Sequence, residues 1–197
     1  NWSLLGDSTM STLKVNSITN TSNKKLLNNS GNIVQTIHAR TDSRNTWSAP
    51  NSYIFTPVTS LTLTITPQHP NNLIVVQLCL SGEIHHDTVL TILRDYGKDE
   101  SLPYGVDANS FHNFNPRHAG MVAGDYTGDD NGSTPRNYFL QGTWQANTLS
   151  QIRFTPGVRS SNSSNRTFYL NRTQGSSGQN SHEICYSSMI AFEVTRG

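Results

Sequence analysis

The densest cluster of side chains that could bind a metal or move a proton is His85-His86-Asp87. Imidazole nitrogens and carboxylate oxygens are zinc ligands and also serve as general acids and bases. These residues precede a strand-like run, and successive residues of a strand point to opposite faces. His85 and Asp87 could therefore share a metal, but His86 could not. Because a zinc site needs three or four ligands, we expect solvent-facing residues at the start of a strand, and no metal site.

The acidic run from Asp125 to Gly132 has the composition of a calcium loop but not its spacing. Counted from Asp125, the sixth position should be Gly and is Asp130, and the twelfth should be Glu and is Arg136. The pair Asn131-Gly132 is more simply the turn of a hairpin.

Motifs of the common enzyme classes are missing from the sequence. His182-Glu183 lacks the second His of a zincin motif, and there is no G-x-S-x-G elbow, phosphate-binding glycine loop or C-x-x-C. His112, His118 and His182 could still pair with a carboxylate in space. We predict a protein that is not an enzyme, with no catalytic residues and no cofactor.

Aromatic side chains in the loop-rich part of the chain are candidates for stacking on sugar rings. We single out Tyr104, Tyr126 and Trp144, and Phe111 and Phe114 are of the same kind. The alternative interpretation of each is an aromatic plug beneath a long loop. Binding of a host cell-surface glycan through the loops of residues 97–137 is therefore kept as the second functional hypothesis.

The composition argues against several classes of partner. Charged residues make up 14% of the 197 residues and the net charge is +1, while Asn, Ser and Thr supply roughly a third of the chain. Such a chain has no electrostatic footprint for nucleic acid. No apolar run approaches the roughly 20 residues that cross a bilayer, and residues 1–30 lack a signal-peptide pattern. We expect no nucleic-acid binding, no membrane insertion and no secretion, with Met10 as an alternative start of the chain.

Two cysteines, Cys79 and Cys185, both lie in strand-like runs. A bridge between neighbouring strands is conceivable, but one pair in a chain of this length is not a disulfide framework. Two small buried thiols are the default expectation.

Residues 1–30 form a region distinct from the rest. Leu13, Val15 and Ile18 are the main apolar anchors, and a polar, turn-rich linker follows them. So little apolar surface does not offset the entropy cost of ordering the segment. We interpret it as an arm ordered by another subunit or by a particle, and the alternative is a frayed terminus.

The stretch Leu61–Leu80 indicates the fold of the remainder, residues 31–197. Leu61, Leu63 and Ile65 alternate with threonines, and the even positions from Ile74 to Leu80 are all apolar. We interpret the two runs as a hairpin joined by a connector rich in Pro and Asn, with Ser81-Gly82 marking a break after it.

About eight short strands separated by turns, with no convincing helix, predict an all-β, antiparallel β-sandwich of jelly-roll-like form. A short pair of strands is expected within residues 97–137, and the run from Ile184 to Val194 is typical of a strand at the centre of a sheet. The odd positions Leu73, Val75 and Gln77 would meet solvent in a lone sandwich, so we predict that they face a neighbouring subunit.

Two segments resemble structural proteins of tailed phages that infect cyanobacteria. Leu13-Lys14-Val15, Ile18, Asn20-Thr21-Ser22 and Ser30-Gly31 match the outline of the opening segment and linker of those proteins. The stretch Leu61–Gly82 with the later run Thr88–Gly97 is similar to a hairpin and a following strand of the same family, and Arg94-Asp95 falls at the corresponding place.

The resemblance implies a virion component: a tail fibre, a knob or a capsid-decoration protein with a jelly-roll-like domain, usually a homotrimer. It implies assembly in the host cytoplasm, a location on the particle exterior, and contact with other virion proteins. The amino-terminal segment would attach the chain to the particle. The His85-His86 pair and the long His- and Asn-rich loops depart from the family's pattern and leave capsid or tail open.

Overall fold

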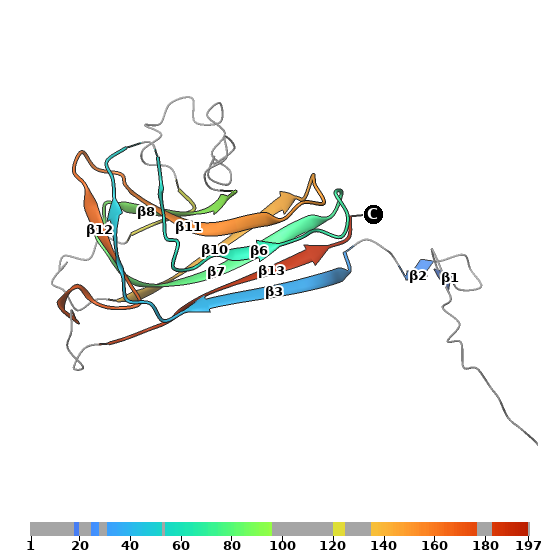
Figure 1. Ribbon diagram of the computed structural model, residues 1–197, viewed down its shortest axis with the longest axis horizontal. Coiled ribbons are helices and arrows are strands. Elements are labelled where there is room, and N and C mark those ends of the chain that lie inside the picture. Colours follow the sequence, from blue (N-terminus) through green and yellow to red (C-terminus); the bar gives the residue numbers. More distant parts are fainter. Residues whose placement is uncertain are drawn as a thin grey trace, which may run out of the picture.

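The chain folds into two antiparallel β-sheets packed face to face (Figure 1), as seen in a computed structural model that describes residues 18–19, 25–27, 31–52, 54–95, 120–124, 135–176 and 183–196. The six-stranded sheet contains β3 (Ile33–Thr41), β4 (Thr46–Ala49), β7 (Leu73–Ile84), β10 (Arg136–Gln145), β12 (Arg166–Leu170) and β13 (Ser187–Val194). The five-stranded sheet contains β5 (Thr56–Pro57), β6 (Leu63–Ile65), β8 (Thr88–Arg94), β9 (Val122–Ala123) and β11 (Ile152–Ser160). The predicted all-β antiparallel sandwich is confirmed.

Period-two side-chain patterns explain which faces meet in the core. Along β7 the even residues from Ile74 to Leu80 are buried, and in β6 Leu63 and Ile65 are buried while Thr64 is exposed. Together with Phe154 of β11 and other side chains of both sheets, these inward faces form one core cluster. The facing assignments made from the sequence are therefore correct for both strands.

The partner of each strand differs from the predicted hairpin. β6 pairs with β11 in one sheet, whereas β7 pairs with β10, β12 and β13 in the other. The six-residue connector between Pro67 and Asn72 is long enough to cross the roughly 10 Å between packed sheets. The chain passes between the sheets repeatedly, for instance from β6 to β7 and from β7 to β8.

Ser81-Gly82 is not a break, because β7 continues to Ile84. On one side β7 pairs with β13 as far as Cys79, and from Gly82 onward it pairs with β12 instead. Gly82 has a φ of 151°, and a Cβ there would lie 2.9 Å from the Phe168 ring and even closer to the Tyr169 carbonyl oxygen. Only glycine fits this close approach of two backbones.

The last strand, β13, lies between β3 and β7, as its sequence pattern predicted. Its buried face carries Ser187, Met189, Ala191 and Glu193, while the larger Ile190, Phe192 and Val194 are half-exposed on the outer face. This distribution is the reverse of what a strand with one solvent-facing side normally shows.

A buried carboxylate fixes the Pro- and Asn-rich connector to the sandwich. Oε1 of Glu193 accepts hydrogen bonds from the backbone N–H groups of Gln68 (2.8 Å) and His69 (3.3 Å) and from Nδ2 of Asn72 (2.7 Å). Glu193 is fully buried. The connector is thereby held from inside by the last strand.

The remaining described elements are small. β1 (Ile18–Thr19) and β2 (Lys25–Leu27) form a two-stranded sheet of their own, drawn beyond one end of the sandwich (Figure 1). Within the expected loop region, β9 pairs with β8, which confirms a short strand there. The described residues include the 3-10 turn η2 (Gln174–Ser176), and no helix among them is long and apolar enough to cross a membrane.

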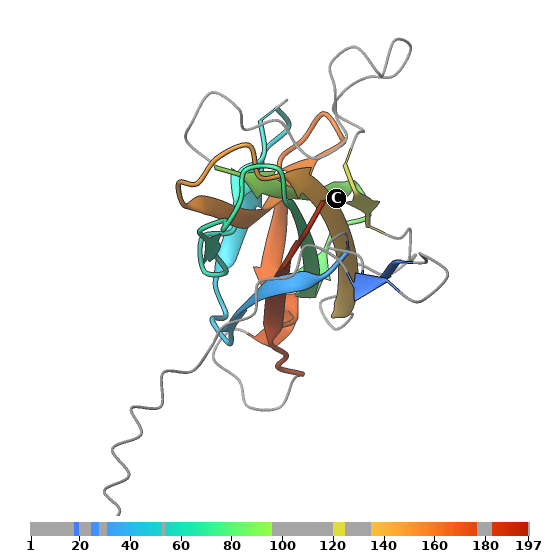
Figure 2. The same cartoon turned by 90° about the vertical axis from the view of Figure 1, so that its right-hand side faces the viewer.

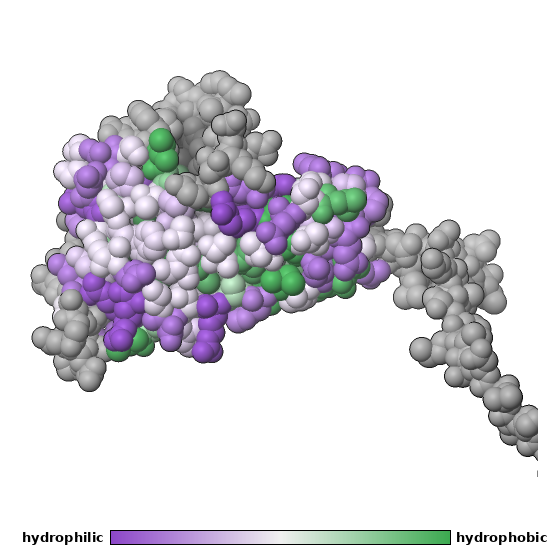
Figure 3. Space-filling view, in the orientation of Figure 1, coloured by the Kyte–Doolittle hydropathy of each residue, from purple (hydrophilic) through white to green (hydrophobic). Residues whose placement is uncertain are grey.

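The start of β3 and the carboxyl-terminal residues lie at the same end of the sandwich, where the Gly31 N–H donates to the Thr195 carbonyl (2.7 Å). Seen from that end, β8 and β11 lie above β3 (Figure 2). Figure 3 shows the side on which β6 lies beside β3, where hydrophilic and neutral surface surrounds a hydrophobic strip between these two strands.

Candidate functional site

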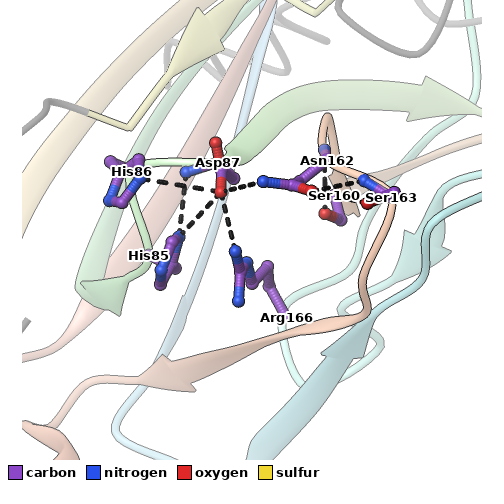
Figure 4. A network of polar contacts seen from close by, with 7 residues as sticks. All are labelled: His85, His86, Asp87, Ser160, Asn162, Ser163 and Arg166. Atoms are coloured by element: carbon purple, nitrogen blue, oxygen red, sulfur yellow. Dashed lines mark hydrogen bonds and ion pairs between the residues drawn. The ribbon is translucent and has the colours of Figure 1, made fainter.

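The turn between β7 and β8 brings His85, His86 and Asp87 together (Figure 4). Nδ1 of His85 lies 3.5 Å from Oδ2 of Asp87, and Nε2 of His86 lies 3.6 Å from the same oxygen. The two imidazole ring centroids are 4.0 Å apart. The expectation that His86 points away from the other two is therefore wrong, because the strand ends at Ile84 and the alternation of faces ends with it.

Two residues from the loop and strand after β11 complete the cluster. Asn162 Nδ2 and Arg166 Nη2 donate to Oδ2 of Asp87 at 2.6 and 2.8 Å. The Ser161 N–H also donates to the Asp87 carbonyl at 2.8 Å. The cluster thus ties the β7–β8 turn, which crosses between the sheets, to the β11–β12 connection.

The electrostatics keep Asp87 ionised. Burial alone would raise the pKa of its carboxyl, but hydrogen bonds from Arg166 and Asn162, together with the charges of His86 and His85, hold the pKa below its usual value. The Asp87 N–H donates to Nδ1 of His85 at 3.1 Å, so this nitrogen accepts a hydrogen bond when the imidazole is neutral. Asp87 is therefore an anion surrounded by donors.

Whether this cluster could hold a metal depends on Oδ2. The nitrogen and oxygen ligand atoms of the three residues lie within 4.8 Å of one another, and separations of 3.5 and 3.6 Å suit a tetrahedral zinc with bonds of about 2.0–2.1 Å. However, that oxygen already accepts hydrogen bonds from Asn162 and Arg166, and a cation bound there would lie next to the Arg166 guanidinium. The geometry favours a cluster that holds two connections together over a metal centre. We call this cluster (His85, His86, Asp87, Asn162 and Arg166) the polar lock. The absence of a metal site stays a prediction.

A small polar hollow of about 200 Å³ opens beside the lock. Its lining includes Glu83, His85, Arg166 and Tyr169. Glu83 is buried, and its Oε2 accepts a hydrogen bond from the Gln174 N–H at 2.8 Å. These groups can hydrogen-bond a small polar molecule, but they hold no nucleophile paired with a base.

Replacing Asp87 with asparagine is expected to lower the free energy of unfolding by about 1–2 kcal/mol at pH 7, because the hydrogen bonds to a charged acceptor become neutral ones. Since the folded-state pKa is lowered, the contribution of Asp87 is fully present above the unfolded pKa of about 3.9. It is lost as the pH falls through the folded-state value. Urea unfolding of both proteins from pH 2 to 7 should show the difference vanish at the acid end.

Asp42 provides the matched control for that experiment because it is exposed and takes no part in the hydrogen bonds around Asp87. Asp42→Asn should unfold at the wild-type urea midpoint at pH 7. An Asp87→Asn protein as stable as wild type at neutral pH would show that the lock adds nothing.

The residues predicted as ligand platforms are only partly covered by the structure. Trp144 lies in β10, where its half-buried ring packs against the core, 4.9 Å from the ring of the fully buried Phe154. Tyr104 and Tyr126 lie outside the described residues. The ligand-binding role of the three stays a prediction.

The predicted attachment residues fall mostly outside the structure as well. Leu13 and Val15 are not among the described residues, and Ile18 belongs to β1, where its partner is Leu27. Cys79 and Cys185 are free thiols, but both are half-buried and not fully buried as expected. Burial raises the pKa of Cys79, and the nearby Cys185 adds to the rise, while a hydrogen bond with Ser81 opposes it.

The predicted interface residues lie on the outer face of β7. Leu73 and Val75 are half-buried and Gln77 is exposed, with Gln77 Nε2 donating to Gln141 Oε1 of β10 at 3.0 Å. A groove of about 460 Å³ runs along this face beside Phe139, a side chain that is 73% exposed. Phe139 was missed from the sequence, since its run Tyr138–Leu140 does not reveal which residue points outward.

Comparison with known proteins does not place the chain in a family. No protein-family model matches the sequence, and no curated protein matches it significantly.

Proposed function

We propose that this chain is a non-enzymatic structural protein on the exterior of a phage particle, attached through its amino-terminal arm, residues 1–30. The observation that carries the proposal is the separate pairing of β1 with β2, in which Ile18 lies opposite Leu27. An isolated two-stranded sheet is marginally stable at best in water. Such a unit gains stability when another surface covers it.

The resemblance of residues 10–31 and 61–97 to virion proteins of tailed phages supports the same proposal, in which a folded sandwich follows a docking arm. Burial of Leu13, Val15 and Ile18 would contribute about 1.5–3 kcal/mol per side chain before ordering costs. One arm then binds weakly, and several copies on one particle hold firmly through avidity. Tail fibre, knob and capsid decoration all fit this mechanism.

The polar lock supports a structural role over a catalytic one. Its Asp87 Oδ2 accepts hydrogen bonds from Asn162 and Arg166, and these bonds join two connections of the sandwich. In the described part of the chain, no other group of three His, Cys, Asp or Glu residues is close enough to bind a metal ion.

Deletion of residues 1–30 is expected to leave a folded domain that no longer assembles onto particles, because the arm supplies the attachment. Thermal unfolding of the truncated chain and its copy number on purified particles measure the two effects separately. Unimpaired assembly of the truncated chain would contradict the attachment role.

A more specific test of the arm replaces only its apolar side chains and keeps its length. Simultaneous change of Leu13, Val15 and Ile18 to serine should reduce particle occupancy at least tenfold. The matched control changes the neighbouring polar residues Thr12, Asn16 and Ser17 to alanine and should assemble as wild type does. Equal loss in both triple variants would point to the arm's backbone or length instead of these anchors.

A further inference from the structure

The outer face of the six-stranded sheet presents a nearly uncharged, partly apolar surface. The outward side chains of β3, β13, β7 and β10 align across the strands: Ile190 lies between His38 and Gln77, and Phe192 lies opposite Val75. The apolar side chains on this face include Val34, Leu73, Val75, Phe139, Ile190, Phe192 and Val194.

The orientation of the strands makes this arrangement informative. β13 turns Ser187, Met189, Ala191 and the carboxylate of Glu193 inward, and it turns Ile190, Phe192 and Val194 outward. β10 likewise buries Tyr138 and Leu140 but leaves Phe139 73% exposed. Large apolar side chains gathered on one sheet face mark a surface that becomes covered.

A projection and a hollow lie side by side on this same face. Phe139 stands at the β10 edge, and the groove of about 460 Å³ next to it is lined by His38, Cys79 and Ile190, among others. A face that carries both a knob and a matching hollow is self-complementary: in a twofold contact, residue i meets j while j meets i. Each Phe139 would then enter the groove of the opposite copy.

The distribution of charge on this face also indicates what kind of partner it can bind. Across the outward positions of β13, β7 and β10 there is no ionised side chain. The cations lie at the margins of the face: Arg40 on the β3 edge, and Arg196, which donates to Oε1 of Gln145 at 3.0 Å. An acidic or basic partner finds no complementary field on this surface. Two copies of the same neutral face meet without like-charge repulsion at the centre.

We propose that this face binds a second copy of this chain, face to face, with Phe139 in the partner's groove. Four strands about 4.8 Å apart and about seven residues long present a flat area of roughly 450 Å². A standard interface uses about 800 Å² of accessible surface on each partner. The contact is therefore of the weak class, and it operates where copies are concentrated.

The proposal concerns a surface other than the arm, and it rests on the proposed function only in that a particle brings many copies close together. Its test needs only the purified full chain in solution, whereas particle occupancy tests attachment. A chain that self-associates but does not attach, or the reverse, separates the two failures.

Sedimentation equilibrium over a wide concentration range should show reversible self-association of the full chain. Phe139→Ser should weaken it at least tenfold with an unchanged melting temperature, since the side chain is mostly exposed in the monomer. Val75→Asp, which would bury a carboxylate in the contact, should abolish it. Ile54→Ser is the matched control, because Ile54 is 74% exposed but lies off this face, between β4 and β5.

Three results would overturn the proposal. One is a chain that stays monomeric at the highest concentration, and another is equal weakening by Ile54→Ser and Phe139→Ser. The third is association that Phe139→Ser and Val75→Asp leave intact in folded protein, which would assign self-association to another surface, such as the arm.

Discussion

Replacing Gly82 with alanine is expected to lower the free energy of unfolding by about 3–5 kcal/mol, enough to unfold a marginally stable domain. With a φ of 151°, Gly82 occupies a backbone region that costs other residues about 1–3 kcal/mol. The added Cβ would also press on the Tyr169 carbonyl oxygen and the Phe168 ring, and such overpacking costs a further 1–3 kcal/mol or so. The strain arises where β7 changes partner from β13 to β12. Neither β7 nor β12 can therefore move away from the added Cβ without disturbing the pairing of the other.

Gly31 separates these two causes. It also has a positive φ, 84°, but a Cβ placed there meets no atom within 4 Å. Gly31→Ala should therefore cost only the backbone term, about 1 kcal/mol. Chemical denaturation of both variants gives the comparison, and similar losses in the two would show that the contact with β12 is not what requires glycine.

Replacing Glu193 with alanine is expected to cost about 3–5 kcal/mol, because it leaves three hydrogen-bond donors of the connector without their acceptor. The donors are the backbone N–H groups of Gln68 and His69 and the side-chain amide of Asn72, which is itself buried. Hydrogen exchange should show the loss first at residues 68 and 69, and urea denaturation should show it globally.

Glu193→Gln is the graded control. All three bonds go to Oε1, so an amide oxygen in that position can still accept them, although more weakly. The amide nitrogen would replace Oε2, which has no hydrogen-bond partner among the described residues. A loss of about 1–2 kcal/mol is expected. If alanine costs no more than glutamine, the carboxylate does not hold the connector.

Local sequence patterns predicted which face of a strand is buried much better than they predicted which strands it pairs with. The alternation of Leu63 and Ile65 with threonine, and the even apolar positions of β7, correctly identify the buried faces, because facing depends only on a strand's own period. Pairing depends on the path of the whole chain. Two consecutive strand signals therefore look like a hairpin, although the structure places them in opposite sheets.

The candidate site was predictable only in part for a similar reason. His85 and Asp87 are conspicuous as a cluster, but Asn162 and Arg166 are ordinary members of a polar loop and strand far along the chain. No local signal connects them to Asp87. The error over His86 arose from extending the alternation of a strand beyond Ile84, and the orientation of Phe139 required the register of β10 against β7.

The central position of β13 in its sheet constrains the order in which the strands can pair during synthesis. The ladders to β3 and to β7 both run through residues 187–194, so neither neighbour can complete its pairing before that strand has been made. Sheets closed by such long-range contacts form slowly, typically in milliseconds to seconds. Until β13 has paired, the apolar residues of β7 are exposed along the edge where β13 will lie. In that period the nascent chain can aggregate with its neighbours on the polysome.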